Sequence, residues 1–192
     1  ELLEDSVNVE QMLEASFAGS MALKLDSAAL IGSGIGTEPQ GIYGTTNVGS
    51  VTSVGKPADY TKFTAGLAAL WTANEMTVTG AIMAPRTLQT LSDMVTGLAS
   101  DKTPLVAPSV VASIPQFITT SIPINLGGGG AESIVIMGNF SRLLIGVRSS
   151  LRVEVLRELY AGNHQYGFLA HLRADVAVEH PESFCVLSGV TA

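Results

Sequence analysis

VIMGNFSRLLIGVRSSLRVEV, residues 135–155, joins two kinds of strand pattern in one stretch. Ser133–Met137 and Leu143–Val147 are short, continuous apolar runs on either side of a Gly-Asn-Phe turn. Runs of this kind predict buried strands. From Ser150 onward apolar residues alternate with charged ones, which predicts a half-buried strand with one charged face. The stretch therefore predicts a buried sheet followed by a long strand with two unlike faces.

Helices and short strands alternate upstream of this stretch. Apolar residues from Leu3 to Leu30 recur at three- and four-residue steps and stop at Gly32, which predicts a long amphipathic helix. Asp59 is expected to cap a second helix, and Gly80–Ala84 reads as a buried strand. Pro85 then suits the first position of a third helix that would reach Gly97.

The remaining chain is rich in strand patterns. A strand-like stretch runs from Tyr166 to Val178, and Phe184–Leu187 predicts a last apolar strand. Helices followed by strands favour the α+β class. The glycine-rich segment Gly32–Gly44 predicts a connector where the chain changes domain, and Phe63 and Trp71 are expected in the core.

Composition excludes several classes of protein. Charged residues make up 14% of the 192 residues, against about 25% in an average soluble domain. The net charge of −7 argues against a protein that mainly grips nucleic acid or an anionic membrane. A single cysteine, Cys185, excludes an intrachain disulfide framework, and prolines interrupt the longest uncharged run, 103–131, so that no membrane-spanning helix is expected. The chain also begins with Glu1 rather than Met, as expected of a processed or truncated product.

No motif in the sequence predicts a catalytic, cofactor or metal site. The glycines at 32, 34 and 36 lack the third glycine, and the flanking elements, of a dinucleotide fingerprint. Gly127–Gly130 lacks the lysine of a phosphate loop and is expected to be a mobile surface loop. The histidines His164, His171 and His180 do not have zinc-site spacing, and no nucleophile setting accompanies His171 and Asp175.

Two charge patterns remain open to two interpretations each. The long helix begins with an acidic half, which is either a solvated face or a surface for a basic partner subunit. The C-terminal strands carry arginines balanced by acids, which suits either an ordinary solvated strand face or salt bridges at a subunit interface. The residues predicted at such an interface are Arg148, Arg152, Glu154, Arg157, Glu158 and Arg173.

Five segments resemble, in order and spacing, the major capsid proteins of tailed phages with the Hong Kong 97 phage capsid fold. The segments are ELLEDS at Glu1–Ser6, LDSAALIGSG at the end of the long helix, GTEPQGIYG at Gly36–Gly44, TGAIMAPRTLQTL at Thr79–Leu91 and VIMGNFSRLLIGVRSSLRVEV at Val135–Val155. Together they extend over nearly the whole chain.

The resemblance implies a peripheral domain with a long spine helix and long strands, formed by residues 1–33 and 148–179. It implies an axial domain with a central sheet flanked by helices, formed by 34–147 and 180–192. An N-terminal arm and an extended loop, which overlap neighbouring subunits in that family, would precede Glu1. Some relatives form a Lys-Asn isopeptide bond with the help of a Glu, but His164 and His171 stand at the aligned Asn and Glu positions. No catalytic residue is therefore assigned.

The sequence thus predicts a structural subunit, not an enzyme, that self-assembles into the icosahedral shell of a tailed phage or prophage. The resemblance implies pentamers and hexamers of this chain, with portal, scaffold and maturation protease as further partners. Packaged DNA would lie nearby without specific binding, in a virion capsid assembled in the bacterial host cytoplasm. Two alternatives remain: an encapsulin-like nanocompartment subunit, and a small hydrolase or ligand-binding domain that uses the connector loop.

Overall fold

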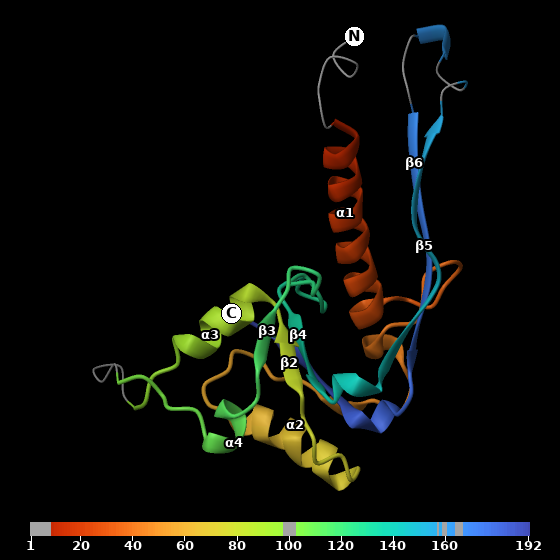
Figure 1. Cartoon of the computed structure of the whole chain (residues 1–192). Coiled ribbons are helices and arrows are strands. Elements are labelled where there is room, and N and C mark those ends of the chain that lie inside the picture. The colour runs from red at the N-terminus through yellow and green to blue at the C-terminus, as the bar shows by residue number, and fades with distance from the viewer. Residues whose placement is uncertain (1–8, 98–102, 157, 159–160, 164–166) are drawn as a thin grey trace. The chain divides into compact units, whose positions relative to one another are not determined.

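The computed structural model describes residues 9–97, 103–156, 158, 161–163 and 167–192 (Figure 1). The helices are α1 (Val9–Ile31), α2 (Thr61–Thr72), α3 (Pro85–Ser92) and α4 (Ser109–Ala112). The strands are β1 (Gly49–Val51), β2 (Gly80–Met83), β3 (Gln116–Ile118), β4 (Ser133–Gly138), β5 (Leu143–Leu156), β6 (Gly167–Val178) and β7 (Phe184–Val190). Short 3-10 turns are η1 (Ile42–Gly44), η2 (Phe140–Arg142), η3 (Ala161–Asn163) and η4 (Pro181–Ser183). The predicted α+β class is confirmed.

The described residues group into two compact units. One unit consists of the described parts of Glu1–Asp26 and Ile145–Asp175. It contains most of α1 and most of the strands β5 and β6. The other unit takes the described parts of Ser27–Leu144 and Val176–Ala192. It contains the remaining strands and the helices α2, α3 and α4.

A five-stranded sheet forms the centre of the second unit, in the order β1-β7-β4-β2-β3. The central strand β4 pairs antiparallel with β2 and β7, whereas the outer strands β1 and β3 run parallel to their neighbours. All six residues of β4 are buried, as its continuous apolar run predicts. β4 has strands on both sides and apolar clusters on both faces, so none of its residues reaches solvent.

Each face of this sheet contributes to a separate apolar cluster. Val135 and Met137 of β4 pack with Leu67 and Leu70 of α2 on one face. Ile134 and Ile136 of β4 pack with other residues, including Ile42, on the other face. The alternation follows from the period of two along a strand. The sheet is therefore covered by apolar side chains on both faces.

The long helix ends where the sequence predicts. α1 stops at Ile31, and the Gly32 amide donates to the Ala28 carbonyl oxygen at 2.9 Å. A Cβ atom at Gly32 would collide with the backbone oxygens of Ala28 and Pro39, so only glycine fits. The predicted first turn of the helix, with its cap, lies outside the described residues.

Four details differ from the sequence predictions. Trp71 is 40% exposed rather than in the core. Leu143–Val147 is not a separate buried strand but the start of the continuous strand β5, where Leu144, Ile145 and Val147 are 48–56% exposed. β3 lies in a proline-rich segment for which no strand was predicted, and α3 ends at Ser92 rather than near Gly97.

Candidate assembly surfaces

Neither a metal cluster nor a catalytic His–Asp pair occurs among the described residues. No group of three or more His, Cys, Asp or Glu residues among them could hold a metal ion. Four residues separate His171 from Asp175 on β6, about 13 Å along an extended strand, too far for a catalytic pair. His164 lies outside the described residues, and burial raises the pKa of the Cys185 thiol to about 11, which keeps it unreactive.

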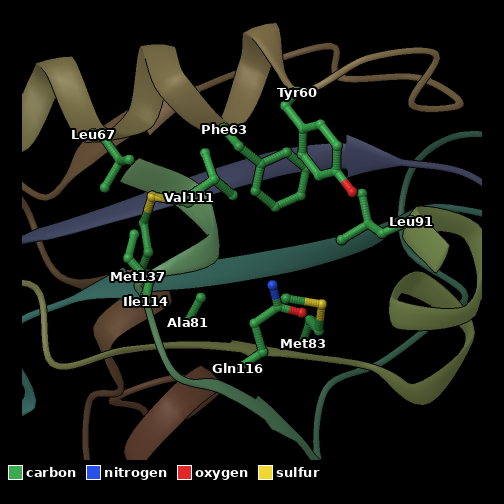
Figure 2. Close-up of a pocket in the computed structure, with 10 residues that line it drawn as sticks. All are labelled: Tyr60, Phe63, Leu67, Ala81, Met83, Leu91, Val111, Ile114, Gln116 and Met137. Carbon is green, nitrogen blue, oxygen red and sulfur yellow. The ribbon is translucent and has the colours of Figure 1, made fainter. Parts of the chain in front are cut away.

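The apolar pocket in Figure 2 belongs to the core. Side chains from α2, α3, α4, β2 and β4 converge on it, among them Phe63, Leu91 and Met137. Its free space is about 10 Å³, room for one water molecule at most. Such a space holds no substrate.

The glycine-rich segments also lack a ligand site. Gly127 and Gly130 form an exposed turn closed by the backbone pair of Leu126 and Glu132. The Glu132 carboxylate lies against Gly127, where an anionic phosphate would be repelled. The connector after α1 closes on itself, because the Gly41 amide donates to the Gly32 carbonyl oxygen at 3.0 Å.

β5 and β6 form a separate two-stranded sheet, called the ribbon below (Figure 1). The Glu179 amide donates to the Arg142 carbonyl oxygen at 2.9 Å, and Gly146 lies beside the Asp175 carbonyl oxygen. Residue numbers therefore rise along one strand as they fall along the other, so the strands are antiparallel. The same register places Arg148 opposite Arg173.

The ribbon has one charged face and one apolar face. Arg148, Arg152 and Glu154 are exposed and share a face of β5, because alternate residues of a strand point the same way. Arg173 of β6 is exposed on this same face, by the register above. The half-buried residues of the other face are Leu151, Val153, Phe168, Ala170, Leu172 and Ala174. The alternation predicted from Ser150 onward is thus present as far as Glu154, whereas Val155 is 43% exposed.

Only one ion pair forms among the described members of the predicted interface set. Arg152 and Glu154 approach to 3.9 Å, with side chains 72% and 47% exposed. Glu158 is exposed, and Arg157 lies outside the described residues. An exposed pair at this distance contributes little to stability. Ion pairing within the predicted set therefore contributes little to holding the ribbon together.

A polar network at the base of the ribbon was not predicted from the sequence. Arg142 Nη1 and Glu179 Oε2 form a salt bridge of 3.0 Å. Asn139 donates from Nδ2 to Glu75 Oε1 at 3.3 Å and accepts from the Ser141 amide at 3.2 Å. Glu75 lies 64 residues from Asn139 in sequence, and no spacing in the sequence indicates this pairing.

The network controls the ionisation of Glu75. Desolvation alone would raise its pKa, but hydrogen bonds from Ser183, the Thr77 amide and Asn139, with the positive charge of Arg142, outweigh it. The pKa of Glu75 therefore lies below its usual range. The role of this charged group is structural, because Asn139 is buried and bonded on both sides of its amide.

Many large apolar side chains are exposed despite the two well-filled clusters. Among them, Val106, Val110, Phe117, Ile118 and Ile124 lie in the uncharged run 103–131. A segment with so many exposed apolar side chains is a candidate for contact with another protein. No described helix is long and apolar enough to cross a bilayer.

A sequence model of the phage capsid family matches residues 1–189. The chain belongs to the phage capsid family. Its function is that of a structural subunit of a capsid shell, and the predicted resemblance is confirmed. Among curated proteins, no sequence matches the chain significantly.

Solved structures share its fold at low sequence identity. The capsid of an empty GTA particle is 19% identical, with a TM-score of 0.68, over 99% of this chain and 69% of that chain. The structure named Gordonia phage Cozz is 14% identical, with a TM-score of 0.71, over 100% of this chain and 66% of that one. A holo-SrpI encapsulin complex from Synechococcus elongatus PCC 7942 is 13% identical, with a TM-score of 0.59, over 96% and 66%. The chain thus spans about two thirds of the length of these neighbours, and the predicted Hong Kong 97 fold is confirmed.

Proposed function

We propose that this chain is the major shell-forming subunit of a tailed phage or prophage, and that its copies form the pentamers and hexamers of an icosahedral shell. The observation that carries the proposal is the family match over residues 1–189. The pocket lined by Phe63, Leu91 and Met137 is a small apolar space within the core, which agrees with a structural role for these residues.

The two units fit the two domains expected of such a subunit. We assign residues 1–33 and 148–179 to a peripheral domain and 34–147 and 180–192 to an axial domain. The structure divides the chain at 26, 145 and 175, close to the proposed boundaries at 33, 148 and 179. The small differences follow from α1, β5 and β6, each of which continues from one unit into the other.

The charged face of the ribbon is the proposed subunit contact. Arg148 and Arg173 lie opposite each other, where like charges disfavour pairing within one chain. An acidic surface of a neighbouring copy would relieve this repulsion, and the net charge of −7 means that acidic surface is plentiful. The proposed contact also includes Arg152, Glu154, Arg157 and Glu158.

Further partners follow from the same proposal. A shell of this kind meets a portal, a scaffold and a maturation protease, and it encloses DNA without specific binding. The net negative charge of the chain supports the proposal that it does not bind the enclosed DNA tightly. The place of assembly would be the bacterial host cytoplasm, and the final location the virion.

Electron microscopy of the gene product tests the proposal. We expect uniform closed particles with five- and sixfold clusters. A stable monomer that turns over a small substrate would overturn the proposal in favour of a hydrolase.

An encapsulin-like compartment is the second candidate, because the encapsulin from Synechococcus elongatus shares the fold with a TM-score of 0.59. The contents of purified particles separate the two. Nuclease-resistant DNA inside the particles supports the phage shell, whereas a single protein cargo without DNA supports the compartment.

A further inference from the structure

β3 forms an edge of the five-stranded sheet, with β2 as its neighbour on one side (Figure 1). The Ala81 amide donates to the Pro115 carbonyl oxygen at 2.9 Å, and the Thr119 amide donates to the Met83 carbonyl oxygen at 3.0 Å. Residues 115 and 119 thus direct their backbone groups toward β2. By the alternation of a parallel ladder, Gln116 and Ile118 direct their amide and carbonyl groups outward.

This edge is short, but it lacks the other devices that normally prevent pairing with another chain. Edge strands are usually protected by charged side chains, by proline or by a covering segment. All three residues of β3 are exposed, and no charged residue occurs anywhere in 103–131. Pro115 does not protect the outer edge, because its missing donor is on the side of β2.

Apolar side chains stand on both faces of β3. The ring of Phe117 lies over Gly80, and a Cβ atom built on Gly80 would lie 2.8 Å from Phe117 Cε2. The side chain of Phe117 is nevertheless 53% exposed. Ile118 is 57% exposed and points to the opposite face. Open backbone groups between two apolar side chains are the features of a strand that accepts another strand.

We propose that the outer edge of β3 is a contact with a second copy of this chain, made by strand addition at Gln116 and Ile118. The inference rests on the proposed function, because shell subunits meet copies of themselves. Copies that meet through the same surface bring like charges together, so any charge in that surface would meet the same charge. The uncharged run 103–131 avoids this repulsion, whereas a partner recognised by charge would find no complement in it.

Two substitutions at one exposed position test the edge. Ile118→Lys adds a charge to it, and Ile118→Pro removes the outward amide donor while leaving the bonds to β2 in place. Met76→Lys is the matched control, since Met76 is 67% exposed and lies outside the uncharged run. Melting temperature and circular dichroism check that each variant folds.

Sedimentation velocity over a range of concentrations, followed by electron microscopy, gives the readout. We expect both Ile118 variants to need at least about tenfold more protein for the same assembled fraction, since truncation of a central contact shifts association by this order. Met76→Lys should assemble like the unmodified chain. Folded Ile118 variants that assemble normally into shells overturn the edge contact and leave the proposed function intact.

Two other outcomes separate the proposals further. Small oligomers of the gene product that depend on Ile118 but never close into shells would support the edge and overturn the shell function. A gene product that stays monomeric at every concentration would overturn both.

Discussion

Reversing the charge of Arg152 should impair assembly far more than folding. In the isolated chain Arg152 pairs with Glu154 at 3.9 Å, and both side chains are largely exposed. Loss of such a pair changes the free energy of unfolding by about 0–1 kcal/mol. For a chain of this size, that corresponds to a change in melting temperature of about 2–4 °C or less.

The effect on a subunit contact is much larger. Close charge pairs across protein interfaces have coupling energies of about 1.5–7 kcal/mol. Each 1.4 kcal/mol changes a dissociation constant about tenfold, so Arg152→Glu should weaken each contact by tenfold or more. Because every subunit of a shell repeats the contact, shell yield should fall steeply.

Shell yield and melting temperature are measured together on the same preparations. Lys62→Glu is the matched control, since Lys62 is exposed on α2 and its substitution changes the net charge equally. Equal loss of yield in both variants would show a general charge effect. Parallel loss of yield and stability in Arg152→Glu, or no loss of either, would refute the role of this arginine in the interface.

Three further predictions concern the fold that carries these surfaces. Gly66→Val should lower the free energy of unfolding by about 1–3 kcal/mol in urea titrations, because even a Cβ atom would lie 3.0 Å from Leu187 and Met137. Cys185 should resist thiol reagents at neutral pH until the chain unfolds, because burial raises its pKa to about 11. At pH values above its ordinary pKa of 4.5, ionised Glu75 stabilises the fold, because the folded state lowers its pKa. This stabilisation is lost as the pH falls through the lower pKa of the folded state. Glu75→Gln should therefore flatten the acid side of a plot of melting temperature against pH.

A contrary result is defined for all three predictions, and Gly19 and Glu14 supply controls for two of them. A Cβ atom at Gly19 would meet no atom within 4 Å, so equal destabilisation by Gly19→Val and Gly66→Val would rule out crowding as the cause. Rapid labelling of Cys185 in the folded chain would mean that the β4–β7 pairing opens readily. An unchanged acid profile in Glu75→Gln, with Glu14→Gln as the comparison, would show that the network at the base of the ribbon does not couple to stability.

The sequence was sufficient where local pattern and final environment agree. Ser133–Gly138 is apolar throughout and fully buried, and Gly32 ends α1 because no larger residue fits beside Ala28 and Pro39. The alternation from Ser150 onward places the arginines on the exposed face of the ribbon. Each of these features depends on neighbours in sequence or on one regular period.

Contacts between distant residues were beyond this kind of prediction. β3 is three residues long and exists because it pairs with β2, more than thirty residues earlier. The pairing of Glu75 with Asn139 is set by how α2 and β4 pack, not by any spacing. Short strands and polar networks of this type are created by tertiary structure, so they carry little local signal.

The errors in predicted burial have a physical meaning in a shell-forming family. Leu144, Ile145, Val147 and Trp71 are apolar enough to predict a core, yet each is at least 40% exposed in the single chain. The apolar pattern of a sequence reflects how buried each residue is in the assembled protein. The structure of one chain shows only the burial that arises within that chain. Members of this family assemble into shells, so we expect these side chains to become buried when copies of the chain meet. They would add to the two contacts already proposed, at the edge of β3 and on the charged face of the ribbon. Apolar residues that the sequence predicts to be buried, but that are exposed in the single chain, therefore indicate which surfaces stabilise the assembly.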